Sequence, residues 1–391
     1  WDMLVVGLMS GTSADAIDVA LVEWPEGAEA KPFSLVAFRE RPHSKGLQQD
    51  IHRLAAGELA AGEMLKELVR LDRLLADRFA DAVLSVLDEA GVGLKEIDGI
   101  ASHGQTVAHH PELGGSLQIG CPVRLAERLK RPVIADFRRR DLAMDGEGAP
   151  LAPFFHHALF ADQNETRGVL NLGGIANLTW LPAGGGPDAV TAFDVGPANA
   201  LLDGVISLAT EGRESFDRDG RLARSGTPVS VWLQEMLADP YLRREPPKST
   251  GRERYGLAEA RQWLARAERE RVDLADLMAT LAEAVTTGVA MACRKIAGAA
   301  ALESGARLYV AGGGVRNGHV MDLLQTSLAG VTVESVAAAG VPAEAVEAMA
   351  FSLMGRNALR GLPNQLPQCT GVAKASVLGV IHGREWGAGI R

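Results

Sequence analysis

The sequence predicts a two-domain α/β protein, and three observations point to this class. The chain has 391 residues, enough for two or three domains of about 150 residues each. Short β-rich runs alternate with longer helical runs. Two segments, around residues 7–22 and 168–181, share a design: an apolar strand, a turn of small or polar residues, and a second strand. Such hairpins in separate halves suggest a duplicated fold with one ligand between the halves.

The individual elements follow from apolar periodicity and from glycine and polar punctuation. Strands are predicted at residues 3–9, 19–24, 33–38, 97–102, 133–136, 169–172, 178–181, 189–193 and 308–311. Helices are predicted within 47–87, after the glycines at 312–314, and at 198–208, 257–268, 273–302 and 344–360. The longest apolar run, 277–293, contains Glu283 and is followed by Arg294 and Lys295. It therefore predicts a buried helix rather than a membrane span.

The composition excludes several classes of protein. The chain is 47% hydrophobic and 23% charged, which rules out collagen-like and disordered classes. A formal net charge of −9 argues against sequence-independent binding of nucleic acid. The three cysteines, Cys121, Cys293 and Cys369, are far apart and form neither a zinc motif nor a disulfide framework. Because no basic signal-peptide region opens the chain, we expect a cytoplasmic protein without a membrane partner.

The first motif that could carry chemistry is the turn at residues 10–18. No Walker-type phosphate loop, nucleophile elbow or dinucleotide fingerprint is present. Instead, Gly11, Thr12 and Ser13 follow a buried strand and offer N–H and O–H donors to phosphate oxygens. Asp15 could orient a hydrated Mg²⁺ ion. An ordinary hairpin turn with Asp15 as a turn residue explains the segment equally well.

Two further motifs follow predicted strands in the second half. Asp194 stands where a strand ends and a helix begins, the edge at which open α/β sheets bind ligands. A carboxylate there can accept a proton from an attacking oxygen, although a helix N-cap is the simpler explanation. The glycines at 312–314 would let a flat heterocycle or ribose lie against the backbone, with Asn317 in reach; a plain loop is the alternative.

The first half contains hydrogen-bonding groups that suit a sugar. They directly follow a predicted strand, and they are Ser102, His103, Gly104, Gln105 and Thr106. The arginine run that begins at Arg138 lies between a strand and a loop, where a guanidinium can bind a carboxylate or phosphate through two hydrogen bonds. A solvated surface is the usual role of such a run, and a lone histidine is more often structural than catalytic.

With these motifs in their order, the sequence resembles the anhydro-N-acetylmuramic acid kinase family along essentially the whole chain. That family belongs to the superfamily of sugar kinases, actin and heat-shock chaperone ATPases. The motifs that carry the resemblance lie at residues 9–13, 102–106, 135–141, 148–151, 171–179, 193–197, 216–220, 247–253, 312–314, 347–351 and 369–371. None is decisive alone, but so many in one order are highly specific.

The resemblance implies a two-domain actin-like ATPase (ribonuclease H-like) architecture with an inter-domain cleft. Residues 1–137 and 367–391 would form the domain with the first phosphate loop, and residues 138–366 the domain with the general base. It also implies that ATP and water convert 1,6-anhydro-N-acetylmuramic acid into N-acetylmuramic acid 6-phosphate and ADP, which recycles cell-wall sugar. The expected ligands are ATP, Mg²⁺ and the amino sugar, and the family suggests a homodimer.

The resemblance further assigns roles to residues. Asp194 would be the general base that activates water for attack on the anomeric carbon, while the freed 6-oxygen takes the γ-phosphoryl group. Arg138 and Glu347 would supply the charges of the substrate site, and residues 102–106 would bind the sugar. The residues expected to bind ATP are Gly11, Thr12, Ser13, Asp15, Asp18, Gly173, Gly174, Gly196, Gly312, Gly313, Gly314 and Asn317. The metal ligands are left open.

The sequence also departs from the family pattern, at residues 145–148 and at Ala16, Ala198 and Cys121. A methyl group at Ala16 or Ala198 requires a negative φ, since alanine at positive φ is strained. Two other functions stay open: a sugar kinase of the same superfamily that acts on an intact sugar, and a non-catalytic ATP-binding sensor or scaffold.

Overall fold

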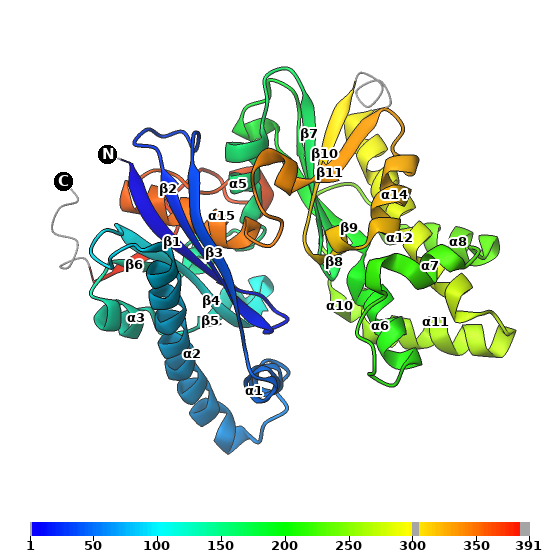
Figure 1. Cartoon of the computed structure of the whole chain (residues 1–391), viewed down its shortest axis with the longest axis horizontal. Helices are drawn as coiled ribbons and strands as arrows, with labels where there is room; N and C mark the ends of the chain where they lie inside the picture. The colour runs from blue at the N-terminus through cyan, green and yellow to red at the C-terminus, as the bar shows by residue number, and fades with distance from the viewer. Residues whose placement is uncertain (1, 299–304, 384–391) are drawn as a thin grey trace. The chain divides into compact units, whose positions relative to one another are not determined.

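The computed structural model describes residues 2–298 and 305–383, and the chain divides into two compact units (Figure 1). The first unit runs up to Leu159 and resumes at Ala345, and the second comprises Phe160–Glu344. This division differs from the expected domain boundaries after residues 137 and 366, both of which fall inside the first unit. Each unit is described by itself below.

The first unit is built on a mixed sheet with the strand order β12-β6-β4-β1-β2-β3, to which β5 adds by pairing with β4. The first three strands form an antiparallel meander, and β4 and β6 extend the sheet parallel to β1. The strands are β1 (Met3–Ser10), β2 (Ala16–Trp24), β3 (Ser34–Pro42), β4 (Gly99–His110), β5 (Gly115–Ile119), β6 (Val133–Ala135) and β12 (Val380–His382). The helices are α1 (Lys45–Ala55), α2 (Ala61–Ala90), α3 (Pro122–Leu129), α4 (Phe137–Leu142), α5 (Ala152–Phe160), α15 (Val346–Leu359) and α16 (Pro367–Thr370).

Two helices cover opposite faces of the first sheet. Val6 and Leu8 of β1 share a buried cluster with Phe79 of α2, whereas the alternate residue Gly7 faces α15. A Cβ atom at Gly7 would lie 1.9 Å from the carbonyl oxygen of Ala348, so only glycine lets α15 approach β1 this closely. Glu347, which is expected to supply the charges of the substrate site together with Arg138, lies on α15. Its position is therefore set by the close packing of the α15 backbone on β1.

The second unit has a sheet of strand order β11-β10-β7-β8-β9. Here β7, β8 and β9 form the antiparallel meander, and β10 and β11 extend the sheet parallel to β7. The strands are β7 (Thr166–Leu172), β8 (Ile175–Leu181), β9 (Thr191–Pro197), β10 (Ala306–Ala311) and β11 (Val331–Ser335). The helices are α6 (Asn199–Ala209), α7 (Arg221–Ser225), α8 (Ser230–Leu237), α9 (Pro240–Arg243), α10 (Arg252–Tyr255), α11 (Leu257–Glu270), α12 (Leu274–Ala297) and α14 (Gly318–Ser327).

The two sheets thus share one connectivity, which confirms the duplicated fold expected from the two hairpins. In each, a three-stranded meander is followed by two strands parallel to its first strand. The prediction of an α/β protein with the actin-like, ribonuclease H-like arrangement is confirmed. Sequence similarity between the halves is weak because only the connectivity and the glycine turns are repeated.

Helix α12 is long and apolar enough to cross a membrane by length and composition, yet 67% of its apolar window is buried inside the protein. Leu277, Leu281 and Val285 pack in the same buried cluster as residues of β7, β9 and β10. The prediction of a buried helix is therefore confirmed. The expected helix at 273–302 ends at Ala297, and residues 299–302 lie outside the described part of the chain.

The structure corrects two predicted strand ends. Residues 102–106 do not follow a strand but lie inside β4, because after an irregularity in its pairing with β1 this strand continues to His110 on a new partner, β5. Asp194 likewise lies inside β9, which continues to Pro197. It is not the N-cap of α6 either, since Ala198 holds that position. The elements that were not predicted are strands β5, β11 and β12 and helices α3, α4, α5, α7, α8, α9, α10 and α16.

Candidate functional site

The glycine turn between β1 and β2 is held from within the sheet. The Ser10 hydroxyl lies 2.7 Å from Oε1 of Gln105 on β4, and Nε2 of Gln105 donates to the carbonyl oxygen of Gly11 at 3.0 Å. Ser10 and Gln105 are each only 1% exposed. Gln105, expected among the sugar-binding residues, therefore has both ends of its amide engaged in holding the turn.

The tip of this turn carries exposed polar groups. Thr12 and Asp15 are exposed, and the Ser13 hydroxyl donates to Oδ1 of Asp15 at 2.6 Å. From α1, Nε2 of Gln48 donates to the carbonyl oxygen of Ser13 at 2.9 Å, and Nε2 of His52 lies 3.0 Å from the same oxygen. The structure confirms a hairpin turn here; its use as a phosphate loop stays a prediction.

The backbone is not strained at Ala16 and Ala198, two positions where the sequence departs from the family pattern. Ala198 has a φ of −146°, and Ala16 is not among the residues with positive φ. A positive φ occurs instead at Ala14, which has a φ of +49° and is fully buried, and at Asp145, which has a φ of +64°. Cys121 directly precedes α3, and its N–H donates to the carbonyl oxygen of Asp72 at 3.3 Å.

Arg138 occupies the first turn of α4 and binds two groups of its own unit. Its Nε donates to Nε2 of His103 at 3.0 Å, and one terminal nitrogen donates to the carbonyl oxygen of Gly148 at 2.7 Å. Because Nδ1 of His103 faces the carbonyl oxygen of Gly104 at 2.9 Å, His103 is the neutral tautomer that accepts at Nε2. Burial and the Arg138 charge hold the pKa of His103 well below its usual value. His103 thus orients Arg138 rather than acting as an acid.

A buried carboxylate, Asp141, holds the loop that binds Arg138. Oδ1 of Asp141 accepts from Nε2 of Gln365 and from the hydroxyl of Thr370, both at 2.7 Å, and Oδ2 accepts from the N–H of Gly148 at 2.7 Å. Asp141 is completely buried, and burial raises its pKa despite these donors. Sequence analysis quoted Asp141 in a motif but gave it no role. The available signal was the three-residue spacing from Arg138, which places both residues on one side of a helix.

The other predicted site residues of the first unit differ in accessibility. Glu347 is exposed in the first turn of α15. Loss of hydration raises the pKa of its carboxyl group, and the Arg138 charge lowers it. Ser102 is 1% exposed and its hydroxyl has no hydrogen-bond partner. Thr106 is partly exposed and accepts from Nε2 of Gln118 at 3.1 Å. The unit therefore brings Arg138, His103 and Glu347 into one electrostatic group.

In the second unit, Asp194 is held at each of its polar atoms. Its N–H donates to the carbonyl oxygen of Lys248 at 3.2 Å, and its carbonyl oxygen accepts from the hydroxyl of Tyr241 at 2.8 Å. Its carboxylate oxygen Oδ1 accepts from the side-chain amide of Asn177, and Oδ2 accepts from the N–H of Thr250 at 2.9 Å. Only Asp194 had been given a role, although Asn177, Lys248 and Thr250 lie in motifs that carry the family resemblance.

Lys248 fixes the segment that reaches Asp194. Its side chain is buried, and Nζ donates to the carbonyl oxygen of Tyr241 at 3.1 Å. Nζ also lies 4.6 Å from the centre of the Tyr241 ring and 5.5 Å from that of Phe193. Burial lowers the pKa of Lys248 to about 8. The family motif at residues 247–253 was the signal that could have found this segment.

The turn that contains Gly173 and Gly174 contacts the first residues of helix α6. The N–H groups of Asn199 and Ala200 donate to the carbonyl oxygens of Gly173 and Gly174, both at 3.1 Å. These two bonds tie the turn between β7 and β8 to the start of α6. Gly196 continues β9 as the partner of Ala176.

The glycine triplet is explained in part by packing. A Cβ atom at Gly312, whose φ is +79°, would lie 2.3 Å from Oδ1 of Asn171, and one at Gly314 would lie 2.5 Å from Cβ of Leu172. Of the three glycines, only Gly313 leaves room for a ligand. A Cβ atom there would lie 3.8 Å from its nearest neighbour, Nδ2 of Asn199. Asn317 caps α14, since its Oδ1 accepts from the N–H of Val320 at 3.1 Å.

Comparison with known proteins decides the family. A model of the anhydro-N-acetylmuramic acid kinase family matches residues 3–384. Proteins named anhydro-N-acetylmuramic acid kinase from Gloeobacter violaceus and Xanthomonas campestris are 41% and 42% identical to this chain. The alignments cover 97% of this chain, with 98% and 97% of the relatives' own lengths. The chain belongs to the anhydro-N-acetylmuramic acid kinase family. A solved ROK hexokinase from Thermus thermophilus covers 88% of this kinase and 98% of its own chain at 16% identity, with a TM-score of 0.38, too low to bear on function.

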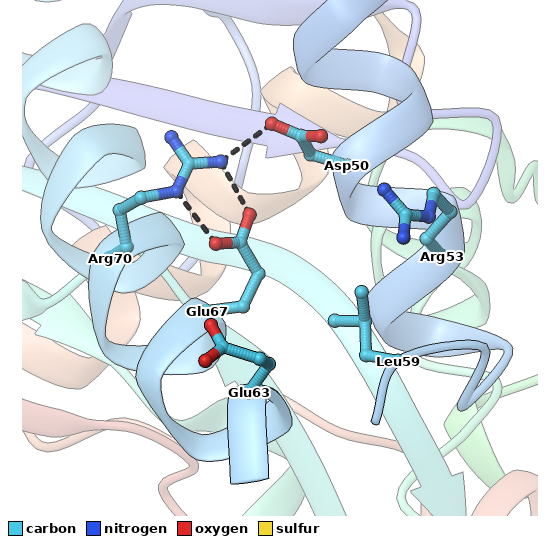
Figure 2. A pocket seen from close by; sticks show the side chains of 6 residues that line it. All are labelled: Asp50, Arg53, Leu59, Glu63, Glu67 and Arg70. Carbon is cyan, nitrogen blue, oxygen red and sulfur yellow. Dashed lines mark hydrogen bonds and ion pairs between the residues drawn. The ribbon is translucent and has the colours of Figure 1, made fainter. Parts of the chain in front are cut away.

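One pocket of this kinase lies in the first unit. It lies between α1 and α2 and is lined by Asp50, Arg53, Leu59, Glu63, Glu67 and Arg70 (Figure 2). Nε of Arg70 donates to Glu67 at 2.8 Å, and a terminal nitrogen donates to Asp50 at 2.6 Å. None of the lining residues is among the predicted site residues, and Arg70 is already paired with two carboxylates.

The described residues of this kinase contain no ready-made metal centre. Within residues 2–298 and 305–383, no group of three or more His, Cys, Asp or Glu side chains is placed to hold a metal ion.

Proposed function

We propose that this chain opens 1,6-anhydro-N-acetylmuramic acid with water and phosphorylates its 6-oxygen with ATP. The products are N-acetylmuramic acid 6-phosphate and ADP. Water forms a bond to the anomeric carbon, the bond from that carbon to the 6-oxygen breaks, and the 6-oxygen takes the γ-phosphoryl group of ATP, so that ADP leaves. Membership in the kinase family supports the reaction, and the geometry of Asp194 is the observation that carries the assignment of residues.

In this proposal, Asp194 is the general base. The two carboxylate oxygens of Asp194 accept from Asn177 and Thr250, so the direction of the carboxylate is set by groups of its own unit. A base whose main chain and side chain are both fixed can receive the proton released as water attacks, without first being reoriented.

Arg138 and Glu347 are proposed to bind the sugar. A guanidinium has five N–H donors, and Arg138 uses two on His103 and Gly148, so three remain for a ligand. N-Acetylmuramic acid carries a carboxylate, which a guanidinium binds well. Burial lowers the pKa of Arg138 only to about 10, so its positive charge persists at neutral pH.

The glycine turns at residues 11–13 and 173–174 are proposed to contact the phosphates of ATP, and Gly313 to lie beside the nucleoside. The exposed carboxylate of Asp15 can accept hydrogen bonds from water in the shell of Mg²⁺. Magnesium bound to the phosphate oxygens would neutralise charge that develops on them. A homodimer and a cytoplasmic location stay predictions; analytical ultracentrifugation tests the first.

The experiment compares the wild type with Asp194→Asn in a coupled assay of ADP release, with and without the anhydro-sugar. General-base catalysis contributes about 10²–10⁴-fold, so we expect turnover to fall by about 10³-fold. ATP affinity, measured by calorimetry, should change by less than about threefold because the amide keeps the size of the side chain.

Product analysis separates the proposal from its rivals. NMR should show N-acetylmuramic acid 6-phosphate formed from the anhydro-sugar. Faster phosphorylation of an intact sugar would favour a different sugar kinase, and ATP binding without sugar-dependent ADP release would favour a sensor. Turnover by Asp194→Asn close to that of the wild type would remove Asp194 as the base.

A further inference from the structure

We propose that Asn177 is a positioning residue for the general base: its amide holds one carboxylate oxygen of Asp194 and so sets the direction in which the carboxylate faces the attacking water. The inference rests on the proposed role of Asp194. It adds a residue from a different strand whose only link to the chemistry is through that carboxylate.

The register of the sheet places the two side chains together. Asn177 of β8 is the direct partner of Asp194 on β9, while the preceding pair joins Ala176 to Gly196. Val195 is therefore an extra residue on β9, which is the definition of a β-bulge. Bulges re-aim a side chain and are frequent beside active sites. Here the bulge sets Asp194, rather than Val195, opposite Asn177.

The amide orientation at this contact is fixed by its partner. Oδ1 of Asp194 is an acceptor, so the nitrogen of the Asn177 amide must face it. The other carboxylate oxygen is held by the N–H of Thr250 at 2.9 Å. Rotation of the carboxylate would break one or both of these hydrogen bonds.

The main chain of Asp194 has its own restraints, which separates backbone support from side-chain positioning. Lys248 accepts from its N–H and Tyr241 donates to its carbonyl oxygen. Loss of the Asn177 amide would leave both of these bonds in place. The strand should therefore persist in an Asn177 variant, while the carboxylate gains freedom to rotate.

Ionisable groups around the pair define what a pH profile can report. Lys248 and Tyr241 interact electrostatically with Asp194, and the charged or ionisable neighbours that act on one or both of them are Asp239, Arg244, Arg254 and Lys295. Burial lowers the pKa of Lys248 to about 8 and raises the pKa of Tyr241 well above its usual value. Neither titrates on the acid side of neutrality, where the activity of a carboxylate base is lost.

The experiment measures kcat, KM and the acid limb of the pH–activity profile for Asn177→Ala and Asn177→Asp. For Asn177→Ala we expect kcat to fall by about 10–100-fold, as misplacement of a reacting group does, with KM for ATP and sugar within about threefold of the wild type. For Asn177→Asp two carboxylates share one contact and cannot both ionise easily, so the acid limb should move up by more than about one pH unit.

Asn164→Asp is the matched control, because it makes the same chemical change at an exposed loop position of the same unit. Its profile should overlay that of the wild type. Melting curves identify any variant that fails to fold, and if Asn177→Asp does, the split between kcat and KM in Asn177→Ala decides the question.

The outcomes separate this inference from the proposed function. Wild-type kcat and an unmoved acid limb in folded Asn177 variants, beside an inactive Asp194→Asn, would overturn the role of Asn177 alone. An active Asp194→Asn would overturn the assignment of the base and, with it, the inference. An equal rise in KM and fall in kcat for Asn177→Ala would indicate a substrate contact instead of positioning.

Discussion

The two units repeat one sheet connectivity but hold opposite charges in different ways. In the first unit the fixed charge is a cation, Arg138, held by a backbone carbonyl and a neutral histidine. In the second it is an anion, Asp194, held by an amide and a backbone N–H. In both units these contacts come from neutral groups, and they set the direction of the charged side chain.

The difference shows what duplication of a fold supplies. Both units place a glycine turn between the first two strands of the meander. The charged groups come from non-equivalent places. Arg138 lies on α4, which follows β6 in the first unit, and Asp194 lies on β9, the third strand of the second unit. The repeated topology therefore provides two similar frameworks, and the distinct chemistry is added at different points of each.

Arg138 gives the largest expected effect among the tests of this comparison. Arg138→Ala should lower kcat/KM by about 10³-fold, equivalent to about 4 kcal/mol, if the guanidinium stabilises substrate charge. Arg138→Lys should recover only part of this loss, because one ammonium cannot reproduce the bonds to both His103 and Gly148. Steady-state ADP release measures both.

Arg139→Ala is the control for that test, since Arg139 is the next residue of α4 and its side chain is 60% exposed. Its activity should stay within about twofold of the wild type, because surface charges of this kind contribute little. A similar loss in both variants would mean that α4, rather than the Arg138 guanidinium, had been disturbed.

Another arginine of the first unit, the buried Arg356 of α15, tests how much carbonyl oxygens contribute to holding a charge in this unit. Its guanidinium is completely buried and donates to the carbonyl oxygens of Pro25, Gly27, Ala28 and Glu29. Arg356→Met removes all of these bonds and should destabilise the unit by about 2–4 kcal/mol, measured by denaturant unfolding. Arg360→Met, on the exposed end of the same helix, should change stability by less than about 0.5 kcal/mol. Equal stability of the two variants would show that the carbonyl cage adds nothing.

Much of the fold was predictable because its signals are local. The strands of both meanders are short apolar runs bounded by glycine or polar turns, and residues 3–9 and 19–24 correspond to β1 and β2. The buried helix α12 could be distinguished from a membrane span because a charged residue interrupts its apolar run. These features depend on neighbours within a few positions of the chain.

The positions of the site residues were harder to predict, since they depend on contacts between distant segments. Asp194 stays within its strand because a bulge and the carbonyl of Lys248 continue the pairing. Asp141 depends on Thr370, which is 229 positions away in the sequence. Gln105 was expected to bind sugar, but its strand continues on β5 and its amide turns to the glycine turn. No local pattern reveals such partners.

Lys248 allows the two units to be compared in one property, the ability of a buried cation to lose its proton. Its expected effect on stability is the smallest of those considered. Like Arg356 it is a buried cation held by a carbonyl oxygen, but lysine can lose its proton and arginine cannot. Burial lowers the pKa of Lys248 from 10.5 to about 8. Between these values the unfolded chain binds more protons than the folded one, so stability rises with pH across this window.

The measurement is urea unfolding of the wild type and Lys248→Met at pH 7 and pH 9.5. Relative to the variant, the wild type should gain up to about 2 kcal/mol, at about 1.4 kcal/mol per pH unit above 8. Lys374→Met, at an exposed position, should show no such pH-dependent difference. A constant difference between wild type and Lys248→Met would mean that this ammonium keeps its proton in the folded state, and that the second unit holds its buried cation as permanently as the first unit holds Arg356.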